Sequence, residues 1–198
     1  MRRSAFPVAI AVLVLLGCKQ EAAPPAQQQA ETPPPGPAPG TPEWKIQNAM
    51  SAAPAAIASQ AAVMDWPATP DGQPSELRKG TNGWACFPDT PGTPGNDPMC
   101  LDGVWQAWAA AWMAHKPFIT KVAGIGYMLQ GGASASNTDP FKMQPDSGEA
   151  WHMEPPHLMW ISPNAAAIDQ MSTDPSYGGP WVMWKGTPYA HVMMPANQ

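Results

Sequence analysis

The sequence is poor in the residues and motifs that carry most known protein chemistry. It contains only four histidines and three cysteines in 198 residues, and ten lysines and arginines stand against fifteen aspartates and glutamates. This acidic balance disfavours nucleic acids and anionic lipid surfaces as partners. Nucleotide-binding loops, the serine-hydrolase elbow, the zinc-protease motif and the c-type haem motif are all absent. We therefore expect neither a nucleic acid nor a nucleotide as partner.

Long apolar runs are also missing, except for one near the N-terminus. Arg2 and Arg3 precede an uninterrupted apolar stretch over residues 5–16. A stretch of this length is too short to cross roughly 30 Å of hydrocarbon comfortably as a permanent helix. We therefore predict a signal peptide over residues 1–17 that is removed on export.

The residues at the end of this stretch are Leu15-Leu16-Gly17-Cys18. They resemble the bacterial lipobox, and the resemblance implies cleavage before Cys18 and attachment of lipid to its thiol. It also implies a cell-envelope protein that contacts a membrane through its N-terminal lipid. The residue after the cysteine is Lys19 and not Asp. A residue other than Asp at this position resembles the sorting signal of lipoproteins that reach the outer membrane and face the periplasm. Ordinary secretion with a stray cysteine remains the alternative to lipid attachment.

The chain after the lipobox changes abruptly in composition. Residues 19–42 include eight prolines and no aromatic or β-branched apolar residue. Such a segment cannot bury enough apolar surface to fold. We predict that residues 18–42 comprise the lipid-attachment site and a disordered Pro-rich tether. Residues 43–198 are long enough to bury a core and are predicted to form a single globular domain.

Cys86 and Cys100 are the other two cysteines. In an oxidising compartment, two cysteines flanking a turn-rich segment favour a structural disulfide. A redox-active pair would instead favour a Cys-x-x-Cys spacing, which is absent. The sequence therefore predicts a disulfide bond that stabilises the fold.

The pattern of apolar residues, prolines and glycines predicts helices as well as short strands. Residues 44–63 favour one or two helical segments interrupted near Pro54. Asp97-Pro98 is typical of an N-cap followed by proline in the first turn, and it predicts a helix that runs to about His115. One side of that helix would carry a stripe at helical spacing: Leu101, Trp105, Trp108, Trp112 and His115.

The remaining predicted elements are strands at residues 62–66, 76–79, 83–87, 121–130 and 157–162, a short helix at 164–171 and a β-hairpin at 181–194. Residues 88–98 and 133–156 are predicted to be loops. Because the last two strands are joined too tightly for a crossover, we expect antiparallel pairing. The sequence predicts an α+β fold in which a mainly antiparallel sheet packs against one Trp-rich helix, in a single domain with long Pro-rich loops.

Tryptophan and methionine are abundant, with ten and thirteen residues against three tyrosines and four phenylalanines. Packing is one reason, because both side chains provide large apolar contacts. Recognition is another, since exposed indole rings stack on sugars or peptides. The candidates for recognition are Trp151, Trp160, Trp181 and Trp184.

The four histidines all lie within two residues of a methionine. On a strand, positions i and i+2 share a face, so His157 with Met159 and His191 with Met193 would each project an imidazole and a thioether together. These donors favour soft ions such as Cu(I). If the two strands are neighbours, the four residues form a candidate copper site. The alternative is that they simply face the core.

Two further segments carry a wider resemblance: Glu76-Leu-Arg-Lys-Gly-Thr-Asn-Gly-Trp-Ala-Cys86 and Pro180-Trp-Val-Met-Trp-Lys-Gly-Thr-Pro-Tyr-Ala-His191. They resemble a group of uncharacterised secreted bacterial proteins. The resemblance implies a single exported domain, and it implies no activity.

Three functions remain open. The lack of catalytic motifs favours a non-catalytic binding or scaffold module for an envelope polymer or a partner protein. The second is a periplasmic soft-metal module that uses His and Met. The third is an envelope hydrolase, in which two of the scattered carboxylates would meet: Asp65, Glu76, Asp102, Asp139, Asp146, Glu149 and Glu154.

Overall fold

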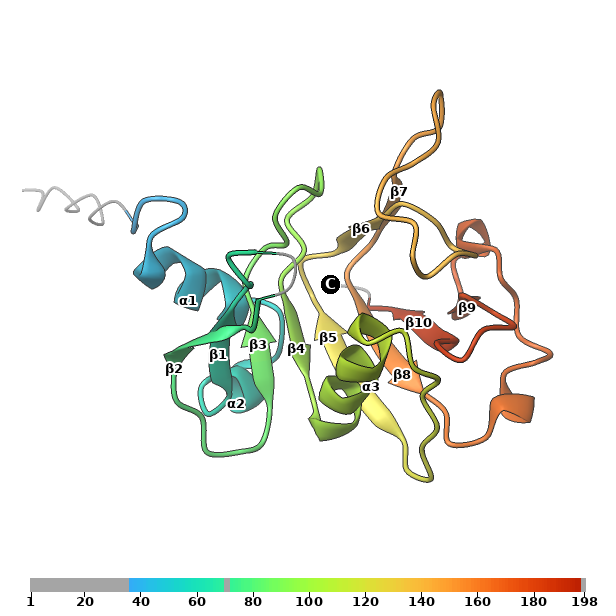
Figure 1. Ribbon diagram of the computed structural model, residues 1–198, viewed down its shortest axis with the longest axis horizontal. Coiled ribbons are helices and arrows are strands. Elements are labelled where there is room, and N and C mark those ends of the chain that lie inside the picture. The colour runs from blue at the N-terminus through green and yellow to red at the C-terminus, as the bar shows by residue number, and fades with distance from the viewer. Residues whose placement is uncertain (1–35, 70–71, 197–198) are drawn as a thin grey trace, which may run out of the picture. The chain divides into compact units, whose positions relative to one another are not determined.

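The structure, a computed structural model, describes residues 36–69 and 72–196 (Figure 1). The predicted signal peptide and Cys18 lie outside the described residues. Helix α1 (Pro42–Met50) begins where the predicted tether ends, and the Thr41 hydroxyl accepts a hydrogen bond from the Trp44 amide at its N-terminus. Within the described residues, no helix has the length and apolar character needed to cross a membrane.

Within residues 36–69 and 72–196, ten strands form two sheets. The strands are β1 (Ala62–Asp65), β2 (Ser75–Arg78), β3 (Ala85–Phe87), β4 (Met99–Leu101), β5 (Gly124–Met128), β6 (Gly132–Ser134), β7 (His152–Glu154), β8 (His157–Ile161), β9 (Trp181–Met183) and β10 (His191–Pro195). The large sheet has the order β2-β1-β3-β4-β5-β8-β10-β9, and β6 pairs with β7 in a small second sheet. Among the described strands, β1 and β3 are the one parallel pair. The predicted α+β fold with a mainly antiparallel sheet is confirmed.

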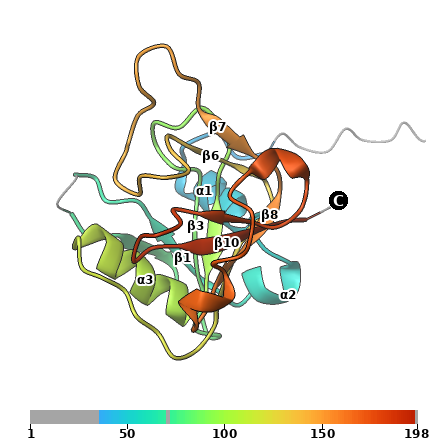
Figure 2. The ribbon, with the colours of Figure 1, turned by 90° about the vertical axis from the view of Figure 1, so that its right-hand side faces the viewer.

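Helices cover both faces of the large sheet. Helix α3 (Gly103–Met113) lies on one side, and α2 (Ala55–Ala58) lies on the other (Figure 2). Small side chains line the α1 and α2 side, where Ala49, Ala58 and Val63 pack beside the cysteines of β3 and β4. On the α3 side the packing is dominated by Trp, Met and Tyr. Two short 3-10 helices, η1 (Ala165–Ala167) and η2 (Pro175–Tyr177), lie in the connection from β8 to β9.

Close contact between α3 and the sheet depends on Gly124 in β5. A Cβ atom at this position would lie 2.8 Å from Cγ1 of Val104, at the start of α3. Asp102 is the N-cap of the helix, and its carboxylate accepts hydrogen bonds from the amides of Trp105 and Ile125. One aspartate therefore both starts α3 and joins it to β5.

The predicted helix start at Asp97-Pro98 is wrong. Residues 99–101 form β4, which pairs with β3 and β5, so the helix begins only after Asp102. The Asp97 carboxylate instead accepts a hydrogen bond from the Thr90 amide and closes the loop before β4. The long loop predicted at residues 133–156 is also interrupted, because its two ends pair as β6 and β7.

The predicted disulfide is present. Cys86 and Cys100 are direct partners in the pairing of β3 with β4, and both are fully buried. The predicted C-terminal pairing is also confirmed, because β9 and β10 run antiparallel.

Candidate binding cavity

A cavity of about 990 Å³ lies on the α3 side of the large sheet. Its walls come from α3, from the inward-facing residues of the strands, and from loop residues that include those at 66–67, 73–74, 90–93 and 135–144. The side chains of Met159 and Met193, on β8 and β10, form part of the sheet wall. The cavity is therefore assembled from segments that are far apart in the sequence.

Tryptophan and methionine dominate the lining. Seven of the ten tryptophans line the cavity, as do eight of the thirteen methionines. These residues are Trp66, Trp84, Trp105, Trp108, Trp112, Trp151 and Trp184, with Met64, Met99, Met113, Met128, Met143, Met159, Met183 and Met193. Most of the abundant tryptophan and methionine residues are therefore found in the wall of this cavity.

Three of the indole rings form a near-parallel stack at this wall. The ring centroids of Trp108 and Trp184 lie 5.8 Å apart with an interplanar angle of 6°, and those of Trp112 and Trp184 lie 6.4 Å apart at 12°. The indole N–H of Trp184 donates a hydrogen bond to the Ser136 carbonyl, and that of Trp112 donates to the Pro140 carbonyl. The donor–acceptor distance is 2.8 Å in both. The stack therefore fixes the neighbouring loop as well as the wall.

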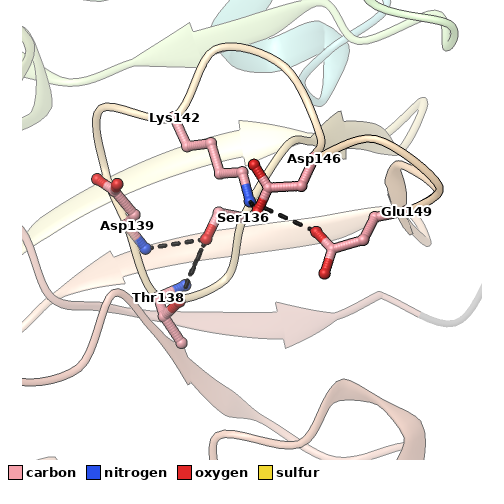
Figure 3. Close-up of polar contacts among 6 residues, drawn as sticks. All are labelled: Ser136, Thr138, Asp139, Lys142, Asp146 and Glu149. Atoms are coloured by element: carbon pink, nitrogen blue, oxygen red, sulfur yellow. Dashed lines mark hydrogen bonds and ion pairs between the residues drawn. The ribbon is translucent and has the colours of Figure 1, made fainter.

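The loop over residues 135–151 is also organised by its own polar contacts. The Ser136 hydroxyl accepts hydrogen bonds from the amides of Thr138 and Asp139, and the Lys142 ammonium pairs with Asp146 and Glu149 (Figure 3). Ser136 and Lys142 line the cavity. Because these contacts close the loop on itself, it forms a defined wall.

One of the polar side chains that line the cavity is that of Glu154, at the end of β7, and its pKa is strongly shifted. The Ser134 hydroxyl donates a hydrogen bond to the Glu154 carboxylate, with a donor–acceptor distance of 2.6 Å. Burial is the main cause that raises the pKa of Glu154 to about 7; the hydrogen bond from Ser134 acts to lower it, and the negative charge of Asp97 adds to the increase. Burial likewise raises the pKa of Asp97, which is 2% exposed and also lines the cavity. Two carboxyl groups with raised pKa values therefore border a mainly apolar space.

The four predicted metal ligands lie on one face of adjacent strands. β8 and β10 pair antiparallel, and Met193 is the direct partner of Met159. The side chains of His157 and His191 are buried on the same face. Since His157 is opposite Pro195, the two histidines lie at opposite ends of the strand pair, with the two methionines between them.

Both histidines are neutral and have one ring nitrogen occupied. Nδ1 of His157 donates to the Pro155 carbonyl and Nδ1 of His191 to the Tyr189 carbonyl. Burial lowers the pKa of each imidazole to about 4. The Nε2 atom of His157 is buried without a hydrogen-bond partner among the described residues. The ring of His191 lies edge-on to Trp105, with centroids 5.0 Å apart.

The other histidines are not part of this arrangement. His115 and His152 are exposed, and His115 stacks on Phe141. Across the part of the chain that the structure describes, no group of three His, Cys, Asp or Glu side chains is placed to bind a metal ion. A metal at β8 and β10 would therefore depend on methionine sulfur.

The tryptophans proposed for surface recognition are not exposed. Trp181 is fully buried, and Trp151, Trp160 and Trp184 are half-buried. All ten tryptophans lie in the described ranges and none is exposed, so the line of exposed rings expected of a polymer-binding surface is not found there.

No protein-family model, curated protein or solved structure matches this chain. Sequence reasoning placed Glu154 only among scattered carboxylates and did not single out Asp97 as a site residue. The excess of Trp and Met was the one sequence signal for the cavity.

Proposed function

We propose that this protein is an exported, lipid-anchored binding module of the cell envelope, and that its domain binds an apolar or aromatic small molecule. The observation that carries the proposal is the cavity of about 990 Å³ and its wall of tryptophan and methionine. Small-molecule sites are typically concave, mostly apolar and of roughly 300–1,000 Å³, with few polar groups. The lipobox-like residues around Cys18 support the envelope location.

The composition of the wall supports binding over simple packing. Side chains used only for packing interdigitate and leave few voids larger than a water molecule. Here the large side chains surround a space that remains open. Methionine adapts to irregular shapes and indole rings stack on flat groups, so this wall suits a hydrophobic ligand with an aromatic or extended body.

A cavity-filling substitution tests the proposal. Ala109 on α3 lines the cavity, whereas Ala107 on the same helix is exposed and does not. We expect the full chain carrying Cys18→Ser, purified without detergent, to bind the neutral fluorescent probe N-phenyl-1-naphthylamine. Ala109→Phe should weaken this binding at least about tenfold, whereas Ala107→Phe should leave it unchanged. Equal binding by both variants, with native circular dichroism, would contradict the proposal.

A soft-metal site is the second candidate, and the register of β8 and β10 favours it. The strands are neighbours, and the sulfurs of Met159 and Met193 lie on directly paired residues. Each histidine donates Nδ1–H to a backbone carbonyl, which is the usual orientation of an imidazole that binds metal through Nε2.

An anaerobic Cu(I) titration against a chromophoric competitor tests this candidate. We expect the protein to compete for Cu(I), and the double variant His157→Ala and His191→Ala to compete less. His152→Ala is the matched control, because His152 is exposed on β7. If the unchanged protein does not compete, or if the double variant competes equally well, the soft-metal candidate is wrong. The apolar-ligand module then remains the proposed function.

A further inference from the structure

Few of the methionines are open to the surrounding solvent. Among the methionines that the structure describes, the exposed ones are Met113, Met143 and Met153, which are 56%, 67% and 61% exposed. Met113 and Met143 also line the cavity, whereas Met153 does not. Two methionines of the described chain are therefore both accessible from solvent and part of the cavity wall.

These two methionines lie close to the contact between α3 and the loop over residues 135–151. Met113 is the last residue of α3, and Met143 belongs to the loop. The helix and the loop are joined by the hydrogen bond that the indole N–H of Trp112 donates to the Pro140 carbonyl. Because Met113 and Met143 border the cavity beside this contact, we call them the rim methionines.

The other methionines of the cavity are shielded from solvent. They are buried or half-buried, and they comprise Met64, Met99, Met128, Met159, Met183 and Met193. An oxidant dissolved in water has to touch the sulfur atom, so it would reach the rim methionines first. In the described part of the chain, Cys86 and Cys100 are joined in a disulfide, so no free thiol there competes for the oxidant.

A peroxide converts the thioether of methionine to a sulfoxide. The sulfur lone pair attacks one peroxide oxygen, the O–O bond breaks, and the other oxygen leaves as water. The sulfur loses two electrons, which the peroxide gains. This reaction turns a flexible apolar side chain into a polar one. Since a polar group has to lose water when an apolar ligand covers it, a sulfoxide in the cavity wall would weaken the binding of such a ligand.

We infer that Met113 and Met143 are oxidative modification sites, at which a peroxide forms sulfoxides that weaken the binding of the apolar ligand. The inference rests on the proposed function and adds a means of regulating the same site. Exposure makes these two side chains reactive, and their place in the wall makes the reaction affect binding. Oxidation of Met153, which is exposed but outside the wall, should leave binding unchanged.

Limited oxidation of the full chain carrying Cys18→Ser tests the inference. The protein is treated with hydrogen peroxide, freed of peroxide by desalting and analysed by peptide mass spectrometry. We expect sulfoxide at Met113, Met143 and Met153 before it appears at the buried cavity methionines. The same samples are titrated with N-phenyl-1-naphthylamine. The oxidised protein should bind this probe about fivefold more weakly, which is the loss expected when a polar group must be desolvated.

Leucine substitutions separate the rim methionines from the third exposed methionine. Leucine is close to methionine in volume, and it has no sulfur to oxidise. The double variant Met113→Leu and Met143→Leu should bind the probe before oxidation and keep its affinity afterwards. Met153→Leu is the matched control, because Met153 is similarly exposed and lies outside the cavity lining. This control should lose affinity on oxidation as the unchanged protein does.

The outcomes distinguish this inference from the proposed function. Unchanged probe binding after sulfoxide has formed at Met113 and Met143, or an equal loss in the double leucine variant, would overturn the inference and leave the apolar-ligand module standing. The inference would also be wrong if the buried cavity methionines were oxidised as fast as the rim methionines. Failure of the protein to bind the probe before any oxidation would overturn the proposed function and the inference with it.

Discussion

At the scale of single residues, Cys86 and Cys100 form a disulfide that lies in the core between α1 and the sheet. Each is fully buried, and the Cys100 sulfur also lies 3.6 Å from the Ala49 carbonyl of α1. The bond closes the loop between β3 and β4, with a sequence separation of 14. The chief effect expected of such a bond is to restrict the unfolded chain.

We expect Cys86→Ala and Cys100→Ala each to lower the free energy of unfolding by about 3 kcal/mol, the value of the chain-entropy model for a loop of this size. The double variant should cost little more than either single one, because both remove the same bond. Urea denaturation of the three variants, with mass spectrometry of alkylated protein, measures this. Additive losses, or two free thiols in protein isolated from the periplasm, would contradict it.

Glu154 should make the protein less stable as the pH rises. Its pKa is about 7 in the folded protein against an ordinary value of 4.5, so the folded state binds the proton more tightly. This contribution to stability is fully present below about pH 4.5 and is lost as the pH rises through about 7. Between about pH 5 and about pH 8, the unchanged protein should lose about 2 kcal/mol more than Glu154→Gln.

Chemical denaturation at the two pH values measures this difference. The buried histidines, with lowered pKa values, act in the opposite direction, because their contribution is lost as the pH falls. They act equally in both proteins, so the comparison reports Glu154 together with its electrostatic interaction with Asp97. Parallel pH profiles for the two proteins would show that this carboxyl group is not buried as described.

At the scale of elements, Asp102 connects α3 to β5. Its two carboxylate oxygens accept from different segments, Oδ1 from the Trp105 amide and Oδ2 from the Ile125 amide. Asp102→Ala should therefore lower the free energy of unfolding by about 2 kcal/mol, through loss of the cap and of the bond to β5. Asp102→Asn should cost less, because its amide oxygen can still cap the helix. Thermal unfolding of both, with exposed Asp169→Ala as control, measures this.

The error at the start of α3 shows what local pattern cannot decide. Asp97-Pro98 and Asp102-Gly103 are both acceptable N-termini, and the apolar residues between them suit a helix or a strand equally well. Pairing with β3 and β5, which are brought together by the fold, decides for the strand. The disulfide could be predicted because the prediction required only two cysteines and the expectation of an oxidising compartment.

At the scale of the whole molecule, the class of fold could be predicted but the cavity could not. The hairpin of β9 and β10 was indicated by local turn chemistry, whereas the wall combines Met64, Trp105, Glu154 and Met193 from four separate elements. The spacing of residues in a sequence does not show which distant elements will come together in the fold. Composition gave the only signal, and it did not distinguish packing from an open space.

The predicted lipid anchor is tested on the whole chain. Cys18→Ser removes the thiol to which lipid would be attached, so the protein should shift from the detergent phase to the aqueous phase in detergent phase partitioning. It should also be left uncleaved or mislocalised. Partitioning of the variant into detergent to the same extent as the unchanged protein would contradict the lipobox interpretation.

The near-parallel rings of Trp108, Trp112 and Trp184 also have an optical consequence. Aromatic transitions on rings 5.8–6.4 Å apart are close enough to couple, so these three rings should contribute to the ultraviolet circular dichroism of the protein. Because Trp108, Trp112 and Trp184 form part of the cavity wall, a molecule entering beside them would change this signal without any label. Occupancy of the cavity could thus be followed in the purified protein by its own circular dichroism, even with a colourless ligand.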